Sequence, residues 1–180
     1  GIVKQAGSMA HYIESGFAGR AGMLAALMAG AGMTGRPDIL EVKGGFCDIM
    51  SGGSGYDPSL ILQDWGEPFR VLKQGEKPYP CCYMLQHFVE AAVSLKKDYG
   101  VLPENVVAIE VETNSSHAGV CRFERPGDPE EAKFSITHGV AAGILAQEVS
   151  LTSFDSGSIT DPAMVSLRNK IAVNVHTEWE

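Results

Sequence analysis

The clearest helical pattern in the chain follows a short loop with prolines at positions 78 and 80. Proline lacks an amide donor and favours extended backbone in the residue before it, so the helix can begin only near Cys81. From there the apolar positions recur at helical spacing and predict one buried stripe, made of Met84, Leu85, Phe88, Ala92, Leu95 and Tyr99. Lys96 and Lys97 complement the helix dipole in the last turn, and Gly100 is the expected end.

Residues 3–31 are rich in Ala, Gly and Met, and they predict a helix that is broken or softened near Ser15 and Gly16. The larger apolar side chains follow the helical period and predict a face buried in a core, made of Met23, Leu24, Leu27 and Met28. The far end, residues 30–35, matches the pattern G-x-G-x-x-G. That pattern binds nucleotides when it follows a strand and opens a helix, whereas here it closes a helix. We therefore interpret it as a cap and a turn.

The next stretch predicts short elements separated by glycines. Helices are expected over residues 37–41, 44–50 and 58–65. Asp57 is the expected cap of the last of these helices, and Pro58 occupies its first position. Residues 69–73 alternate apolar and polar side chains, which predicts a short strand.

The second half of the chain mixes strands with helices. Residues 106–112 form the clearest predicted strand, because Val and Ile alternate with Glu, and residues 171–175 alternate as a final strand. A helix is expected to start at Pro129, with a buried side made of Phe134, Ile136, Val140, Ala141, Ile144 and Leu145. Short helical pieces are expected over residues 151–154 and 162–170.

This order of elements predicts an α+β fold in two parts, with a boundary near residues 66–76, where the composition shifts from Gly, Ala and Met to β-branched residues. The sequence stops on its last predicted strand without a turn or a cap. We therefore expect a fragment of a longer protein, or a domain whose sheet continues in residues that are not present.

Composition narrows the class of protein. Hydrophobic residues make up 44% and charged residues 20% of the 180 residues, which is typical of a globular protein. The net charge of −8, without a basic run, argues against nucleic acid as a partner. No apolar run is long enough to cross a membrane and no signal peptide is evident, so we expect no membrane partner and a cytoplasmic location. The four cysteines form no C-x-x-C pair and are expected to be reduced thiols.

The start of the helix after the prolines carries the candidate chemistry. Unpaired amides at a helix N-terminus bear a partial positive charge, and Lys77 adds a full charge a few residues upstream, which favours binding of a carboxylate. The alternative is an ordinary loop with a surface lysine and two small buried cysteines. His87 and His138 lie beside apolar stripes and are expected to be packed or surface residues, whereas His117, in a polar loop after a strand, is a candidate for substrate contact.

Three stretches, in matching order and spacing, give the chain a family likeness. They are Glu14–Gly35 with Pro37–Glu41 and Gly45-Phe46, then Lys77-Pro-Tyr-Pro-Cys-Cys82 with its helix, and then Ala132-Lys-Phe-Ser135. Together they resemble the MmgE/PrpD family, which includes methylcitrate dehydratases, cis-aconitate decarboxylases and iminodisuccinate epimerases. The likeness implies that residues 1–70 are the C-terminal part of an all-helical domain and that residues 71–180 are most of an α+β lid-type domain. It also implies an active site between the two domains and a homodimer.

The likeness further implies chemistry next to a carboxylate of a small di- or tricarboxylate, by dehydration, decarboxylation or epimerisation. Lys77 and Cys82 take catalytic positions, and Cys82 aligns with a catalytic His of decarboxylase-like relatives. His11 and Glu14 stand where many relatives have Lys and then His. Lys77 and the amides at positions 81 and 82 would stabilise negative charge on the substrate. An imidazole gains or loses a proton near neutral pH, which suits His11 as an acid or base.

The complete set of expected site residues follows from these arguments. The catalytic candidates are Lys77, Cys82 and His11, and the substrate-binding candidates are Glu14, Cys81 and His117. Cys82 would be a proton carrier if the helix start lowers its pKa, and otherwise a small packing residue. No cofactor and no metal are expected, because His11 and Glu14 lack a third ligand in the sequence pattern.

One other class of function stays open at this point, and a third class is disfavoured. The chain could be a non-catalytic fragment or dimerising module that lacks a complete active site, since the preceding part of the helical domain supplies further Asp and His residues in the family. A cysteine hydrolase that uses Cys82 is disfavoured, because no clear arrangement of His with Asn or Asp accompanies it.

Overall fold

The computed structural model describes residues 3–66 and 68–179 of the chain. These residues form two compact units, one made of the residues up to 17 together with those from 77 onward, and the other of residues 18–76. The expected α+β class, with helices and a small sheet, is confirmed. The predicted domain boundary at residue 70 stays a prediction, because the two units are defined by contacts within this chain alone.

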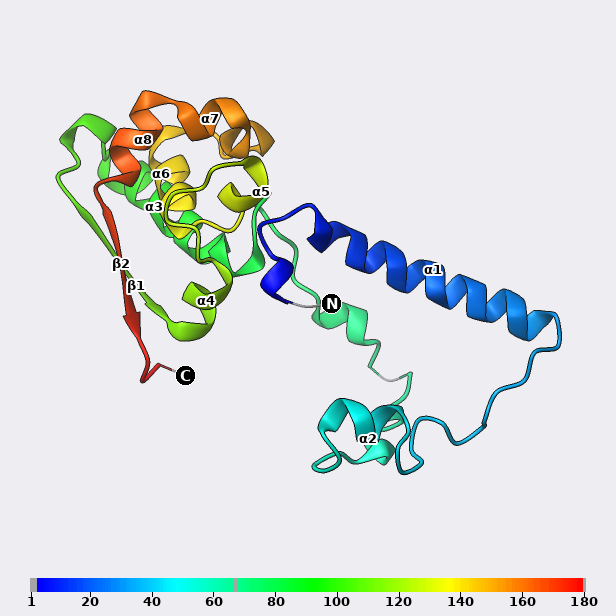
Figure 1. Ribbon diagram of the computed structural model, residues 1–180. Coiled ribbons are helices and arrows are strands. Elements are labelled where there is room, and N and C mark those ends of the chain that lie inside the picture. The colour runs from blue at the N-terminus through cyan, green and yellow to red at the C-terminus, as the bar shows by residue number, and fades with distance from the viewer. Residues whose placement is uncertain (1–2, 67, 180) are drawn as a thin grey trace. The chain divides into compact units, whose positions relative to one another are not determined.

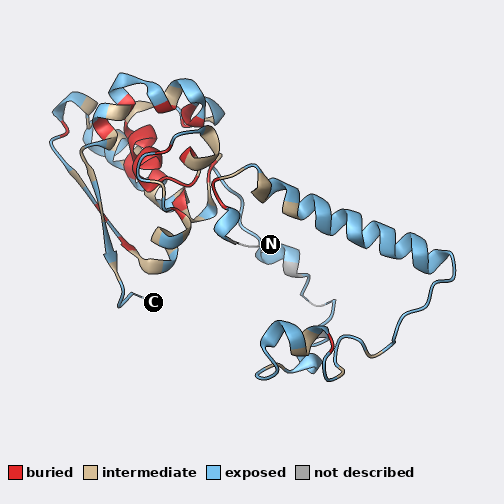
Figure 2. Cartoon of the chain, viewed as in Figure 1, coloured by how far each residue is buried: buried red, intermediate tan, exposed pale blue. Residues whose placement is uncertain are grey.

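The core of the larger unit lies between two helices, α3 (Gln86–Tyr99) and α6 (Ile136–Leu145), which pack against each other. From Ile136 to Ile144 every residue of α6 is buried, and Figure 2 shows this element as the centre of the buried set. Gly143 allows the close approach, because a Cβ there would lie 2.7 Å from the Cβ of Ala92 on α3. The packing of α3 on α6 therefore depends on a residue without a side chain.

The buried face of α3 differs in part from the predicted stripe. Leu85, Val89 and Ala92 are buried, whereas Leu95 and Tyr99 are exposed. A 3₁₀ turn over Tyr83–Leu85 precedes the helix, which begins at Gln86 and not at position 81. The reason for the difference is that α6 covers only one side of the expected stripe on α3. The other side of the stripe borders an open apolar groove. The expected end is confirmed, because Gly100 adopts a left-handed conformation after Lys96 and Lys97.

Two parallel strands, β1 (Ile109–Asn114) and β2 (Ile171–His176), form the small sheet of the described residues, with Ile109 paired to Ile171. Both lie side by side in Figure 1. Parallel strands need a long crossover, and the segment between them supplies it. That segment contains α4 (Ser115–Val120), α5 (Pro129–Ala132), α6, α7 (Ser156–Thr160) and α8 (Pro162–Arg168), with a 3₁₀ helix over Leu151–Phe154. Both predicted strands are therefore confirmed. Strand β1 lies two to three residues further along the chain than the expected range 106–112.

The single helix that was expected from Pro129 onward is in fact two. Helix α5 ends at Ala132, and Ser135 then caps α6 by accepting a hydrogen bond from the amide of His138 at 3.1 Å. The predicted buried side chains are buried, except for Leu145, which is half-buried. The short helix α7 was missed, because its residues Ser156–Thr160 carry no helical apolar pattern, and the cap from Asp155 signals it only weakly.

Helix α1 (Ala10–Gly30) is continuous, so the predicted softening near Ser15 and Gly16 is wrong. Its apolar side chains at Met23, Leu24 and Leu27 are exposed, and no residue of the helix is buried. The expectation of a core helix is therefore wrong for the described residues, because no element of theirs covers this face. Gly32, with a φ of +92°, confirms the turn that was expected after the helix.

The unit of residues 18–76 contains only short elements after α1. Helix α2 (Phe46–Ser51) is confirmed, whereas residues 37–41 form turns in place of a helix. The helix expected over residues 58–65 is a shorter 3₁₀ helix, Pro58–Ile61, which Asp57 caps as predicted. The strand expected over residues 69–73 is a 3₁₀ helix, Arg70–Lys73, because its backbone closes local hydrogen bonds and no described strand pairs with it.

Candidate functional site

One pocket brings together most of the residues that the sequence singled out. This site pocket has a volume of about 360 Å³ and lies within the larger unit, where the start of α1, the proline-containing loop and the connection between α5 and α6 meet. It is lined by His11, Tyr12, Lys77, Tyr79, Pro80, Cys81, Cys82, Lys133, Phe134 and Leu151. Four of the six expected site residues are in this set, and all three catalytic candidates are among them.

Gln86, the first residue of α3, holds the proline-containing loop in place. Its side-chain amide donates to the carbonyl of Tyr79 at 2.9 Å and accepts from the amide of Tyr79 at 3.0 Å. The Cys82 amide donates to the carbonyl of Lys133 at 2.9 Å, which ties the loop to the connection before α6. The hydroxyl of Tyr79 donates to the carboxylate of Glu90, which lies one turn of α3 beyond Gln86. These bonds fix the backbone on both sides of the site pocket, so its walls are set by tertiary contacts.

Cys82 has the most perturbed chemistry of the lining residues. A hydrogen bond from the Cys121 thiol lowers the pKa of Cys82, against the opposing effect of burial. The amides of Met84 and Leu85 and the charge of Lys77 lower it further, although neither amide makes a close capping hydrogen bond. A thiol beside a cation and a helix start is expected to ionise more readily than an ordinary one. Cys82 is therefore suited to hold a thiolate near neutral pH.

The two neighbouring thiols behave in the opposite way. Burial, followed by the proximity of Cys82, raises the pKa of Cys81 to about 12. The hydrogen bond that Cys121 donates to Cys82, together with burial, raises the pKa of Cys121. Of these three thiols, Cys82 is therefore the one that ionises most readily, because two adjacent thiolates would repel each other in a poorly solvated place.

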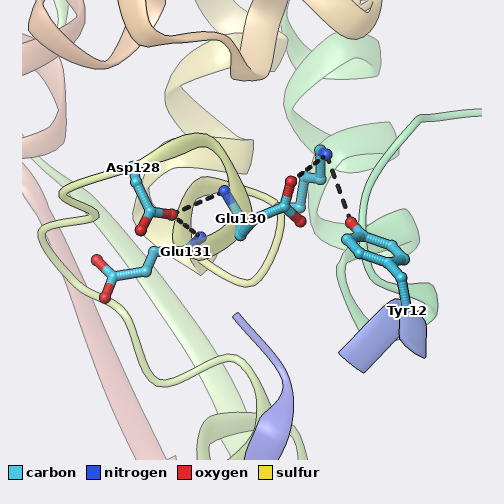
Figure 3. Close-up of polar contacts among 5 residues, drawn as sticks. Tyr12, Asp128, Glu130 and Glu131 are labelled. Carbon is cyan, nitrogen blue, oxygen red and sulfur yellow. Dashed lines mark hydrogen bonds and ion pairs between the residues drawn. The ribbon is translucent and has the colours of Figure 1, made fainter. Parts of the chain in front are cut away.

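Lys133 places a second ammonium group at the site pocket. Its Nζ donates to a carboxylate oxygen of Glu130 at 3.1 Å and to the hydroxyl of Tyr12 at 3.4 Å, and Figure 3 shows how Glu130 and Tyr12 converge there. Burial acts to lower the pKa of Lys133, but the contacts with Glu130 and Tyr12 outweigh it and raise the pKa. Asp128 fixes this turn by accepting from the amides of Glu130 and Glu131 at 2.8 and 2.9 Å.

His11 reaches the site pocket from the first turn of α1. Its ring meets the ring of Phe134 edge-on, with 5.7 Å between centroids. Its Nδ1 lies 3.8 Å from a carboxylate oxygen of Glu14, and among the described residues this buried nitrogen has no hydrogen-bond partner. Glu14 itself does not line the pocket. The expected pairing of His11 and Glu14 on one helix face is therefore present, with His11 at the pocket and Glu14 behind it.

His117 is not brought to the site pocket. It lies in the short helix α4 and not in the loop that was expected, since the side chain of Asn114 caps the helix by accepting from the His117 amide at 2.8 Å. The Nδ1 of His117 contacts the same oxygen at 2.7 Å, and its ring packs against that of His87 at 5.2 Å between centroids. His138 is fully buried, with its Nε2 2.7 Å from the carbonyl of Ser153, in agreement with the expected packed role.

A larger groove, of about 750 Å³, lies between α3 and β1. Its lining is mostly apolar, including Phe88, Leu95 and Tyr99, and its charged lining residues are the acidic Glu110 and Glu112. A carboxylate would be repelled there and would find no cation. The site pocket is smaller, but it alone of the two has ammonium groups in its lining, so we take it as the candidate site.

The lining residues with polar side chains that were not singled out as site residues from the sequence are Tyr12, Tyr79 and Lys133. The sequence signal for Lys133 was its place in the Ala132-Lys-Phe-Ser135 stretch. For Tyr12 the sequence gave no signal except that it adjoins His11. Within residues 3–66 and 68–179, no three His, Cys, Asp or Glu side chains gather in a way that could hold a metal ion. In the same described part of the chain, no helix combines the length and apolar character that a bilayer crossing requires.

Comparisons with known proteins add a family context. Residues 79–180 match the model of the MmgE/PrpD C-terminal domain, and residues 2–59 match the model of the MmgE/PrpD N-terminal domain. Two curated sequences from Aspergillus terreus, one of them from strain NIH 2624, are similar to the chain and are both named cis-aconitate decarboxylase. Each is 26% identical over 191 residues, which cover 98% of the chain and 39% of the relative. The chain thus spans about two fifths of the length of these relatives.

Proposed function

The chain belongs to the MmgE/PrpD family, and on this premise we propose that it is part of an enzyme that acts on a small di- or tricarboxylate next to one of its carboxylates. The reaction class is a lyase reaction, by dehydration or decarboxylation, or an isomerase reaction by epimerisation. The observation that carries the proposal is the site pocket, in which two lysines, a histidine and an ionisable cysteine converge.

The lysines supply the binding of the acid. Lys77 and Lys133 line the same pocket from two segments that are joined by the backbone hydrogen bond between Cys82 and Lys133. A charge-assisted hydrogen bond to a carboxylate contributes about 1.5–3 kcal/mol each. Two of them can hold a substrate with two carboxylates in one orientation. They also stabilise the negative charge that builds up beside a carboxylate when a proton or carbon dioxide leaves.

Cys82 and His11 supply the proton transfer. Because the pKa of Cys82 is lowered, first by the hydrogen bond from Cys121, its sulfur is a thiolate that accepts a proton and does not donate one in the resting state. His11 lines the same pocket and supplies the complementary imidazole, and a carboxylate oxygen of Glu14 lies behind it, 3.8 Å from its Nδ1. This division assigns Cys82 the role of base and His11 that of the complementary acid.

The choice among the three reactions rests on the relatives. The Aspergillus terreus proteins are named cis-aconitate decarboxylase, so cis-aconitate is the first substrate to test, followed by methylcitrate and aspartate-derived diacids. The chain covers 39% of these relatives, so the test needs both this chain and a protein extended to the relatives' length. Carbon dioxide release, double-bond absorbance and chiral analysis of the product distinguish decarboxylation, dehydration and epimerisation.

A sharp test uses two variants of the extended protein. Cys82→Ala removes the proposed base and should lower kcat by about 100-fold or more with little change in KM, since general base catalysis contributes roughly 10²–10⁴-fold. Lys133→Met should chiefly raise KM. Lys97→Met, on the exposed side of α3, is the matched control and should change neither constant. If the extended protein neither binds any of these acids nor converts them, the proposed function is wrong.

A second candidate function is a non-catalytic or dimerising module. The observation that favours it is α1, whose apolar residues Phe17, Met23, Leu24 and Leu27 are exposed and which buries none of its residues. Such a face needs a cover, either the rest of a helical domain or a second subunit. We also propose a homodimer and a cytoplasmic location. Sedimentation of the chain and of the extended protein tests the subunit state, and a monomeric extended protein would contradict the dimer.

A further inference from the structure

The positive charge of the site pocket is partly compensated by a carboxylate that stands behind its lining. Two ammonium groups line the pocket, those of Lys77 and Lys133, and its described lining contains no arginine. Glu130 places a carboxylate oxygen 3.1 Å from the Nζ of Lys133. The two side chains of this pair are only 24% and 20% exposed, so water and salt screen their attraction less than at an open surface. One of the two ammonium groups is therefore paired before a ligand arrives.

The backbone of α5 holds the carboxylate of Glu130 in place. Asp128 caps this helix by accepting from the amides of Glu130 and Glu131 at 2.8 and 2.9 Å (Figure 3). Lys133 follows Glu130 by three residues, which is the spacing at which side chains on one helix face meet. The second oxygen of Glu130, Oε2, is buried and has no hydrogen-bond partner among the described residues. Within that part of the chain, Lys133 is thus the cation that balances the charge of Glu130.

The ammonium group of Lys133 has one donor left for a ligand. A lysine side chain carries three N–H donors. One of them donates to Glu130 and a second to the hydroxyl of Tyr12 at 3.4 Å, and the ring centroid of Tyr12 lies 5.7 Å from the same nitrogen. The third donor can bind a carboxylate oxygen in the pocket. Lys133 can therefore hold one carboxylate of a ligand, with a charge that it already shares with Glu130.

Lys77 supplies the ammonium group that is not shared. It forms no ion pair with a carboxylate of residues 3–66 or 68–179. Cys82 lines the same pocket and adds a negative charge to it when its thiol ionises. Before a ligand enters, the two ammonium groups thus face one carboxylate, or one carboxylate and one thiolate.

We propose that Glu130 is a specificity-determining residue, which makes the site select dicarboxylates over tricarboxylates. This selectivity rests on the proposed function, because it concerns the acids that the same pocket takes. Two carboxylates find two ammonium groups. A third carboxylate finds no further ammonium group in the described lining and is repelled by Glu130. Size does not discriminate, because a volume of about 360 Å³ holds either kind of acid.

The repulsion depends on the charge of the ligand in a way that an experiment can isolate. The Coulomb energy between Glu130 and a bound acid is proportional to the charge of the acid. Glu130→Gln removes the negative charge and keeps an oxygen that can accept from Lys133. Both kinds of acid should then bind more tightly, and the acid with three charges should gain more. An ion pair that only stabilises the turn would leave the ratio of the two affinities unchanged.

Calorimetry of the extended protein with succinate and with tricarballylate near neutral pH tests this selectivity. The two acids differ by one carboxymethyl group, and the parent protein should bind succinate more tightly. Glu130→Gln should increase the affinity for tricarballylate at least about threefold more than the affinity for succinate, as expected for one charge removed from a partly exposed site. Glu130→Asp keeps the charge and should keep the preference for succinate.

Glu131→Gln is the matched control. It removes the same charge from the next position of α5, where the carboxylate accepts from the amide of Gly127 at 2.7 Å and a glutamine oxygen can do the same. This variant should leave the ratio of the two affinities unchanged, and circular dichroism checks that both variants keep the fold.

Several outcomes would overturn the proposal and leave the proposed function standing, since the acids would still bind. They are tighter binding of tricarballylate than of succinate by the parent protein, an unchanged ratio in Glu130→Gln, and an equal change of the ratio in Glu131→Gln. Weaker binding of both acids by a folded Glu130→Gln variant would also contradict it, because Glu130 would then support Lys133 and not limit its charge. Binding of neither acid by the parent protein would overturn the selectivity and count against the proposed function as well.

Discussion

Replacing Gly143 by alanine tests the packing that holds the two sides of the site pocket together. Helix α3 begins four residues after Cys82 and α6 begins three residues after Lys133, so the contact between these helices sets the distance between the two lining segments. A Cβ at position 143 would lie 2.7 Å from the Cβ of Ala92 and 3.0 Å from the carbonyl oxygen of Val89. Backbone atoms cannot move aside as a flexible side chain can, so the helices must separate.

The size of the effect follows from two opposing terms. Overpacking a tight core costs about 1–3 kcal/mol, and contact with backbone favours the upper half of that range. Alanine regains about 1 kcal/mol over glycine inside a helix. We therefore expect Gly143→Ala to lower the free energy of unfolding by about 1–2 kcal/mol. In a chain of this size that corresponds to a fall of about 2–8 °C in Tm.

Two other glycines on helices provide matched controls. At Gly139 the nearest atom to a new Cβ is a side-chain methyl of Val89 at 3.1 Å, so Gly139→Ala should be close to neutral. At Gly119 on α4 nothing lies within 4 Å, so Gly119→Ala should stabilise the chain by up to about 1 kcal/mol. Urea denaturation followed by circular dichroism measures all three variants, and hydrogen exchange of α3 and α6 amides locates the change.

The order of the three variants decides the matter. If Gly143→Ala is as stable as the parent chain, or more stable than Gly119→Ala, then α3 and α6 do not approach as closely as described. If stability falls but exchange in α3 and α6 is unaltered, the loss arises elsewhere and the assigned cause is wrong.

Three further predictions concern charge. Lys77→Met should weaken the binding of citrate, measured by calorimetry, roughly 10- to 100-fold, because a charge-assisted contact of about 1.5–3 kcal/mol is lost. Lys97→Met, at an exposed position, should leave citrate binding unchanged. An equal loss of affinity in both variants would contradict a specific role of Lys77. The lowered pKa of Cys82 means that its thiolate persists as the pH falls. At pH 6 iodoacetamide should therefore alkylate Cys82 at least about threefold faster than it alkylates the thiol of free glutathione. Equal rates of alkylation would show that the pKa of Cys82 is not lowered. The hydrogen bond that His176 donates to the Glu112 carboxylate raises the pKa of His176, so the protonated ring is stabilised until the pH rises through that raised pKa, where the charged contact is lost. Glu112→Gln should therefore move the midpoint of the NMR titration of His176 to lower pH, and an unmoved midpoint would show that the contact does not form.

The proline-containing loop shows how far local sequence rules reach. Prolines at positions 78 and 80 exclude regular structure and Gly100 ends the helix that follows, so the end of that helix was readable, whereas its start was expected near Cys81 and lies at Gln86. The hydrogen bonds of Gln86 were not, because a glutamine that bonds back to the loop looks the same in the sequence as one on a surface. The strand expected over residues 69–73 failed for a related reason, since alternation predicts a strand only where a partner strand exists to pair with it.

The sequence by itself determined the class of fold, the two strands, the caps at Asp57 and Gly100 and the family likeness, because these depend on backbone stereochemistry and on residue order, which act over short distances. Only the tertiary structure decided which of the expected site residues meet. It brought Lys77 and Cys82 together with His11 and added Lys133 and Tyr12, but it left His117 in another helix. The physical reason is that a pocket is made by long-range packing, here of α3 on α6 across Gly143. The pKa values of Cys82 and Cys121 also depend on the tertiary structure, because it decides which of the two sulfurs accepts a hydrogen bond from the other.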